Sequence, residues 1–255
     1  MLELSTAQTE ADFEDVYRFW YEVYVTEMGR HQNDAKTSHQ NRKLYDPLAT
    51  AGSLCIARQD GEVVGTILST PVDHPAIENY RSLYDLDSLS PEDQWASAIN
   101  TKLMVKANLR RTRLPVRLAF AAYTWGLHVG IKHAYMDCND HLLKLFYRLG
   151  YEQHLPTLYH ADYGQVNSMR LELTDETHLR KVGSPFLSAL KRYQHEQELA
   201  PDEQSQKDRP QYKRPQPARS QRRQTTPPPA FSSQQQANQQ EADQQQAAAA
   251  PAPAA

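Results

Sequence analysis

The 255-residue sequence lacks the marks of several common classes of protein. Its two cysteines, Cys55 and Cys138, are too few for a disulfide framework, and both stand in apolar runs typical of buried, reduced thiols. No HExxH or CxxC spacing occurs, so we expect no metal site. The formal net charge of −3 gives no basis for binding nucleic acid.

Long apolar segments are missing as well. No run approaches the ~20 residues that a membrane-spanning helix requires. The N-terminus lacks the basic-then-apolar pattern of a secretion signal. We therefore expect a cytoplasmic protein with no membrane span.

Residues 199–255 lack the apolar side chains that a core needs. From Thr225 onward Pro, Ala, Gln, Ser and Thr dominate, and Phe231 is the single aromatic residue. Such a segment cannot offset the ~1–2 kcal/mol per residue that ordering a backbone costs. We predict a folded domain over residues 1–198 and a disordered tail over 199–255. Seven basic residues of the tail indicate either simple solvation or a weak contact with an acidic partner: Lys207, Arg209, Lys213, Arg214, Arg219, Arg222 and Arg223.

The pattern of apolar residues predicts a mixed α/β domain. Apolar side chains recur at helical spacing over residues 13–24, after a Thr9–Asp12 pair that resembles a capping box, in a helix that ends near Gly29. The other predicted elements are strands at 53–58, 63–70, 99–105, 133–138, 151–155, 158–163 and 169–173, helices at 114–129, 142–149 and 185–198, and an irregular insert with one short helix at 71–98. The order strand, helix, strand in the middle predicts a βαβ unit.

A basic loop joins the predicted strand 99–105 to the helix that begins near Leu114. The first N–H groups of a helix have no partner within it, and they favour an anion. The loop adds four cations: Lys106, Arg110, Arg111 and Arg113. Such a loop indicates either a phosphate-bearing ligand or an exposed segment with no ligand, and its composition leaves both open.

Residues 103–114 resemble the acyl-donor loop of the GNAT acyltransferases. In that family a strand ending in Val is followed five residues later by Gln or Arg, and then by a glycine-containing turn. Val105 and Arg110 match this pattern, whereas Arg111 and Arg113 stand where the family has glycines. The resemblance implies a GNAT-like α/β (α+β) fold, with a central mixed sheet flanked by helices. The residues that it implies for binding an acyl thioester and its phosphopantetheine are Met104, Val105, Lys106, Arg110, Arg111, Thr112, Arg113 and Asn139.

A second match follows downstream. Asn139 and the later segment 145–151 are similar to the family's Asn…Leu-Tyr-x-x-Gly-Phe segment. By that match Tyr147 is the acid that protonates the leaving thiolate. Composition alone favours an ordinary packed aromatic at this position.

The N-terminal part resembles one branch of the family. Residues 19–29, Asp46 and residues 63–66 look like the long-chain N-acyl amino acid synthases and the acyl-homoserine-lactone synthases. This branch implies a fatty acyl donor, on acyl carrier protein or CoA, with no bound cofactor. Basic residues at the thioester entrance would suit an acidic carrier protein. Arg111 and Arg113 favour that donor, because without glycine a backbone approaches a pyrophosphate less freely.

The same resemblance makes Glu27 and Asp46 candidates for the catalytic base. Each is otherwise an ordinary surface carboxylate. Trp20 and Ile67 stand where the lactone synthases carry arginine, so we rank lactone-signal synthesis below N-acyl amino acid formation.

The function implied is transfer of an acyl group, of long chain in this branch, to an amine. The acceptor is an amino acid or another small-molecule amine, or alternatively a lysine or ornithine of a peptide. A non-catalytic GNAT-like module that binds an acyl carrier is the alternative of a different class, because the missing glycines and the unassigned base both fit it.

Overall fold

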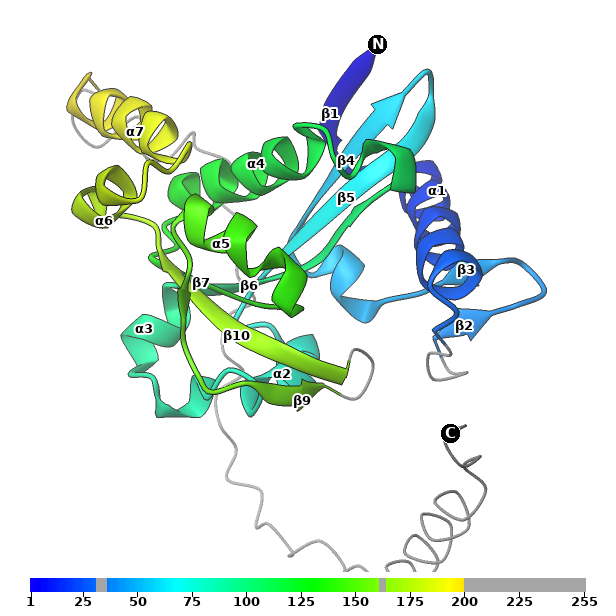
Figure 1. The fold of residues 1–255 in the computed structure, drawn as a ribbon, viewed down its shortest axis with the longest axis horizontal. Coiled ribbons are helices and arrows are strands. Elements are labelled where there is room, and N and C mark those ends of the chain that lie inside the picture. The colour runs from blue at the N-terminus through cyan, green and yellow to red at the C-terminus, as the bar shows by residue number, and fades with distance from the viewer. Residues whose placement is uncertain (31–35, 161–163, 200–255) are drawn as a thin grey trace, which may run out of the picture. The chain divides into compact units, whose positions relative to one another are not determined.

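The computed structural model describes residues 1–30, 36–160 and 164–199. An eight-stranded sheet runs through this part of the chain, in the order β1-β4-β5-β6-β7-β10-β8, with β9 also paired to β10 (Figure 1). Its strands are β1 Leu2–Thr6, β4 Ser53–Gln59, β5 Glu62–Pro71, β6 Ser97–Val105, β7 His133–Cys138, β8 Glu152–Gln153, β9 Leu158–His160 and β10 Gly164–Glu172. A separate pair is formed by β2 Thr37–Ser38 and β3 Lys43–Leu44.

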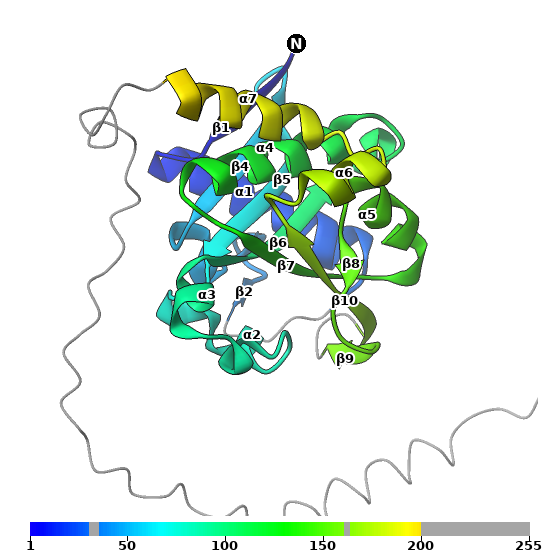
Figure 2. The same cartoon turned by 90° about the vertical axis from the view of Figure 1, so that its left-hand side faces the viewer.

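Helices cover both faces of the sheet (Figures 1 and 2). The α-helices are α1 Glu10–Tyr21, α2 Glu78–Arg81, α3 Pro91–Trp95, α4 Leu114–His128, α5 Leu143–Leu149, α6 Glu176–Lys181 and α7 Leu187–Leu199. The core is divided accordingly. Trp20, Tyr84 and Tyr135 are buried on the face of α1 and the insert, whereas Leu118, Phe146 and Phe186 are buried on the face of α4, α5 and α7.

Most predicted elements are present. Residues 161–163, which end a predicted strand, lie outside the described residues. So do residues 200–255, which make up nearly all of the predicted tail. Four features were missed: strand β1, the β2–β3 pair, helix α6, and a second short helix in the insert, where α2 and α3 replace the single helix that we expected. These elements are two to six residues long, too short for hydrophobic periodicity to reveal.

Helix α1 begins at the predicted capping box. The Thr9 hydroxyl accepts a hydrogen bond from the Asp12 N–H at 3.2 Å, and the Asp12 carboxylate accepts one from the Thr9 N–H at 3.0 Å. The helix continues as a π-helical segment, Glu22–Glu27, and the chain leaves it at Gly29 with a φ of 62°. This extension carries the first helix to the end of β6, where the candidate site lies.

The central βαβ unit is paired over a short distance only. β6 and β7 run parallel, and they pair over three residues of each strand, from Ser97 with His133 to Ile99 with Tyr135. Beyond this point β6 remains paired with β5, and β7 remains paired with β10. The two strands therefore separate toward their carboxyl ends, which is the edge where open α/β sheets bind ligands.

A β-bulge in β6 accompanies this separation. The register of β5 against β6 shifts between Thr66 and Leu68, and Lys102 lies opposite with a φ of 54°. The Thr66 hydroxyl donates to the Lys102 carbonyl at 2.9 Å and accepts from the Trp20 indole N–H at 3.0 Å. Bulges bend a strand and increase its twist, so this one directs the end of β6 away from β7.

Candidate functional site

A cavity of about 300 Å³ occupies the cleft between β6 and β7. Its walls include residues 100–105 of β6 and residues 136–139, which end β7 and begin the following turn. The π-helical end of the first helix contributes Val23 and Tyr24, and the region of α5 closes the opposite side. The cavity therefore lies where the sheet opens, at the carboxyl ends of two parallel strands.

The two sides of the cavity differ in chemistry. On the face of α4 and α5 the walls are apolar, with Leu103, Pro115, Met136, Cys138, Leu142, Leu145 and Phe146. On the face of α1 and the insert the walls are more polar, with Tyr24, Tyr80, Thr101, Lys102 and Asp137. Side chains alternate between the two faces of a sheet, so neighbours such as Met136 and Asp137 lie on different sides of the cavity. A ligand in this cavity can place an apolar part on one side and a polar part on the other.

Asp137 is the one carboxylate among the described residues that line the cavity. The hydroxyl of Tyr84 donates a hydrogen bond of 2.6 Å to its Oδ1. Tyr84 is fully buried in the insert, where its carbonyl also lies 3.0 Å from Nε2 of His154. The insert thus holds this carboxylate in place. Asp137 was not among the predicted site residues.

The predicted base Glu27 is engaged by a predicted donor-binding residue, Arg110. The guanidinium of Arg110 contacts both oxygens of the Glu27 carboxylate, at 2.5 and 2.7 Å, and its Nε donates to the Val105 carbonyl at 2.9 Å. Such a two-point pair fixes both side chains. Arg110 lines the cavity, whereas Glu27 is not among its lining residues in the described part of the chain.

Asp46 forms a buried ion pair. Its Oδ2 lies 3.0 Å from Nζ of Lys102, and the two side chains are 6% and 4% exposed. Its Oδ1 accepts the N–H of Leu48 at 2.9 Å and so starts the 3₁₀ turn Pro47–Thr50. The Lys102 ammonium also lies 5.1 Å from the ring centre of Tyr24. Lys102 lines the cavity and Asp46 stands behind it, so the predicted base candidate here is the partner of a buried cation.

The backbone of β6 presents a hydrogen-bond donor to the open side of the strand. The N–H of Lys106 donates to the carbonyl of Val64 in β5 at 2.9 Å. Backbone groups of successive strand residues point in opposite directions, so the N–H of Val105 points away from β5, and that of Met104 points toward it. Because β7 has separated from β6 here, the N–H of Val105 is better placed than that of Met104 to donate to a ligand in the cavity.

The rest of the basic loop does not converge on the cavity. Lys106 pairs with Glu62 at 2.9 Å. The Thr112 hydroxyl donates to the Leu109 carbonyl at 2.7 Å, and Arg111 and Arg113 are exposed. None of these four predicted binding residues is among the described residues that line the cavity. Met104, Val105, Arg110 and Asn139 are among them, and so is Arg30, which no sequence pattern indicated.

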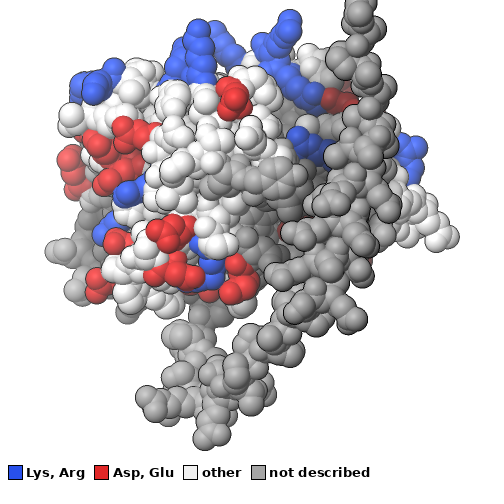
Figure 3. Space-filling view, turned by 60° about the horizontal axis from the view of Figure 1, so that its bottom comes forward, with Lys and Arg blue, Asp and Glu red and all other residues white. Residues whose placement is uncertain are grey.

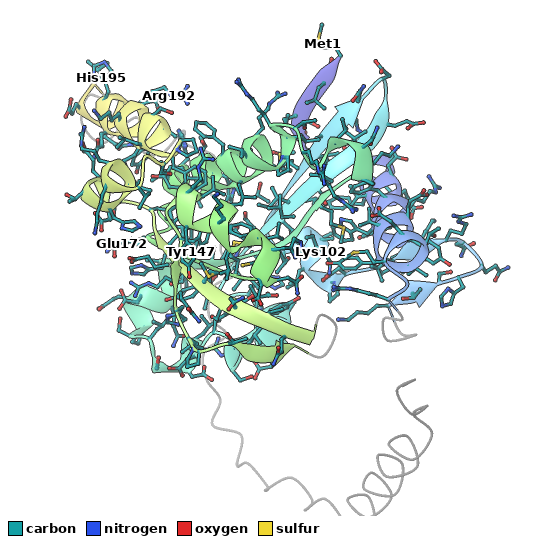
Figure 4. The ribbon with its side chains drawn as sticks, in the orientation of Figure 1. Met1, Lys102, Tyr147, Glu172, Arg192 and His195 are labelled. Atoms are coloured by element: carbon teal, nitrogen blue, oxygen red, sulfur yellow. The ribbon has the colours of Figure 1, made fainter. Side chains whose placement is uncertain are left out.

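Tyr147, the predicted acid, lies on α5 with its side chain outward. It is 42% exposed, and it is not among the cavity-lining residues of the described chain, which on this helix are Leu145 and Phe146. Figure 4 labels it apart from Lys102 on β6. Residues one position apart on a helix point in directions about 100° apart, so Tyr147 faces outward while its neighbour Phe146 lines the cavity.

Charge is unevenly placed on the surface. The insert exposes Asp85, Asp87 and Glu92, and Figure 3 shows Asp and Glu side chains gathered on the lower face of the molecule. The exposed Arg111 and Arg113 instead precede α4. A negatively charged ligand or partner is therefore favoured at the start of α4 rather than at the insert.

Two kinds of feature are absent from the described ranges. No group of three or more His, Cys, Asp and Glu side chains there is arranged to hold a metal ion. No helix in these ranges is long and apolar enough to cross a membrane.

The fold is the GNAT-like fold that the sequence predicted, a mixed sheet flanked by helices and opened between two parallel central strands. No protein-family model matches the sequence, and no curated protein matches it. Solved structures do. The chain is similar to BjaI, a CoA-dependent acyl-homoserine lactone synthase described with SAM and isopentyl-CoA, with a TM-score of 0.56 and 15% identity over 76% of this chain and 99% of that one.

Two other solved structures have the same architecture. FeeM, an N-acyl amino acid synthase from uncultured soil microbes, matches with a TM-score of 0.55 and 11% identity, over 74% of this chain and 97% of that chain. The acyl-homoserine lactone synthase LasI matches with a TM-score of 0.51 and 12% identity, over 68% of this chain and 89% of that chain. At these identities the likeness establishes the fold.

Proposed function

We propose that this protein is an N-acyltransferase, which moves an acyl group from a thioester donor to the nitrogen of an amine. The observation that carries the proposal is the cavity in the β6–β7 cleft, with its apolar and polar sides and the Val105 N–H at its edge. An acyl thioester and an amine need those two environments next to each other. BjaI, an acyl-homoserine lactone synthase, and FeeM, an N-acyl amino acid synthase, have this fold and support the same reaction class.

The acyl group occupies the apolar side in this proposal. Leu103, Met136 and Phe146 give it a surface on which burial is favourable. The thioester carbonyl then lies at the end of β6, where the N–H of Val105 stabilises the negative charge that develops on its oxygen. Arg110 supports this arrangement, because its bond to the Val105 carbonyl fixes the same peptide segment.

The acceptor occupies the polar side. Its nitrogen attacks the thioester carbon, a C–N bond forms, and the C–S bond breaks. The proton that the nitrogen loses goes to the Asp137 carboxylate, which we place as the base because Glu27 and Asp46 are held in ion pairs with Arg110 and Lys102. The leaving thiolate takes up a proton and departs as a free thiol. That Tyr147 supplies this proton remains a prediction from the sequence.

The proposal includes acyl carrier protein or CoA as the donor. BjaI and MesI are described as CoA-dependent, which supports a CoA thioester. The exposed Arg111 and Arg113 support an acidic carrier protein, because complementary charge speeds the encounter of two proteins. Salt weakens such an exposed attraction, so the carrier reaction should slow as ionic strength rises.

Charge reversal distinguishes the two donors. With acyl carrier protein as donor, Arg111→Glu/Arg113→Glu is expected to raise KM severalfold and to leave kcat unchanged. Lys132→Glu is the matched control, because Lys132 is exposed and precedes β7 at the opposite end of that strand from the cavity. The assay is release of free thiol from acyl carrier protein and from acyl-CoA with a panel of amines. Release from neither donor with any amine would contradict the proposed function.

Lactone-signal synthesis is a second candidate, favoured by the likeness to lactone synthases described with SAM or with MTA. Including SAM in the amine panel tests it. A lactone product would support this candidate, and an N-acyl amino acid or N-acyl peptide would favour the first.

A further inference from the structure

Asn100, which lines the cavity, belongs to a chain of three buried polar side chains. The Ser69 hydroxyl donates to Oδ1 of Asn100 at 2.6 Å, and the Asn100 amide donates to the Tyr151 hydroxyl at 3.0 Å. All three residues are buried, and burial raises the pKa of Tyr151 to about 12, so its hydroxyl stays protonated at neutral pH. These contacts join β5, β6 and the residue that follows Gly150 at the end of α5.

The position of Asn100 is the inner apex of the cleft. The last paired residues of the two parallel strands are Ile99 and Tyr135, so Asn100 is the first β6 residue beyond the pairing. It lines the cavity, together with Phe146, whose ring meets that of Tyr151 edge-on at 5.6 Å between centres. A chain that enters at Val105 and runs along β6 toward the apex meets this group of side chains.

A second, small void lies behind them. It measures about 10 Å³, and its lining includes Tyr151, Gly126 and Leu171, next to α4. Asn100 is also part of this lining, and it is the one residue of the described chain that lines both the void and the main cavity. Truncating Asn100 would join the two spaces and lengthen the cavity toward α4.

We propose that Asn100 and Tyr151 form a stop that sets the longest acyl chain the enzyme accepts. The inference rests on the proposed function, because it assigns the apolar side of the cavity to the acyl group. Burying an amide and a phenol is favourable only when they pair with each other, so the bond holds both in one position. Moving either group aside would break this bond, so the pair yields less readily to an acyl chain than apolar side chains would.

If this stop exists, the enzyme accepts acyl chains only up to a certain length, and a substitution at Asn100 changes that length. The experiment measures kcat/KM for a series of acyl thioesters from acetyl to palmitoyl. In the wild-type protein kcat/KM is expected to rise about fourfold for each methylene that the cavity buries, and then to fall sharply at the limit. In Asn100→Ala the limit moves to longer chains, with a gain of about tenfold or more for the first thioesters beyond the wild-type limit. Asn100→Leu refills the space and keeps the limit.

Tyr151→Phe serves as a milder variant in case Asn100→Ala folds poorly. It keeps the ring and removes the hydroxyl that holds the Asn100 amide, so a smaller shift of the limit in the same direction is expected. Leu171→Ala is the matched control. It enlarges the core beside the second void without touching Asn100, so it should lower stability and leave the chain-length profile unchanged.

The outcomes separate the stop from the proposed function. If the wild-type protein turns over acyl thioesters and the limit is the same in Asn100→Ala and Tyr151→Phe, the stop is wrong and the function stands. If no thioester is turned over, the proposed function fails. Calorimetric binding of free fatty acids of increasing length then still tests the stop: a longer limit in Asn100→Ala than in wild type supports it, and an unchanged limit overturns it.

Discussion

Replacing Asp137 by asparagine removes the proposed base and changes little else. The Tyr84 hydroxyl donates to Oδ1 of Asp137 at 2.6 Å, and the amide oxygen of asparagine can accept the same bond. The side chain therefore keeps its place but can no longer take a proton. General-base catalysis contributes about 10²–10⁴-fold, which is about 3–5 kcal/mol in the activation barrier. We expect kcat of Asp137→Asn to fall by a factor in that range.

The assay is thiol release under saturating donor and acceptor, with thermal unfolding measured on the same samples. Asp140→Asn is the control, because Asp140 is an exposed carboxylate three residues away in the sequence and outside the cavity lining of the described chain. It should keep both kcat and Tm. Raising the pH should restore part of the lost activity of Asp137→Asn, because the acceptor amine then loses its proton to solvent. A loss of less than about tenfold, with no response to pH, would refute the base assignment.

Lys102→Met leaves the buried Asp46 carboxylate without its cation, so the free energy of unfolding in urea should fall by about 3–5 kcal/mol. Adding Asp46→Asn should recover part of this loss. If the losses of the two single variants simply add in the double variant, the pairing is contradicted. Burial raises the pKa of Cys55 to about 11 and that of Cys138 to about 12, whereas thiols in unfolded chains ionise near ~8.5. The two neutral thiols therefore contribute their full stability below the pKa of an unfolded thiol. This contribution is lost as the pH rises through about 11 for Cys55 and about 12 for Cys138. Cys55→Ala/Cys138→Ala should make the alkaline decline in the free energy of unfolding shallower, and an unchanged decline would show that other groups cause it. Tyr147→Phe is expected to lower turnover without changing Tm, because the side chain is exposed; unchanged turnover would remove its role as the acid.

Local chemistry made much of the fold predictable. The capping box at Thr9 fixes the start of the first helix, and Gly29, which adopts a positive φ, marks its end. Between such signals the apolar spacing of α4 and the uninterrupted apolar run of β7 were sufficient to place both elements. These features depend on residues close together in the sequence, which is why a single sequence displays them.

The site was predictable only in part, because it depends on contacts between distant residues. The resemblance located Val105, Arg110 and Asn139, and all three line the cavity. It could not reveal that Asp46 pairs with Lys102, because 56 residues separate them in the sequence and a bulge in β6 directs that lysine. Nor could it reveal that Tyr84, in a segment that looked irregular, holds Asp137 in place. Pairing across a fold is set by packing, which no local pattern encodes.

The most direct test of acyl transfer is a single-turnover experiment with an isotope-labelled acyl thioester, an amine acceptor and the protein in excess, analysed by mass spectrometry. The account predicts that the label appears in an N-acyl product together with one equivalent of free thiol, and that Asp137→Asn delays both. Recovery of the thioester bound but intact would contradict it, and would instead identify the protein as a module that binds acyl donors without turning them over.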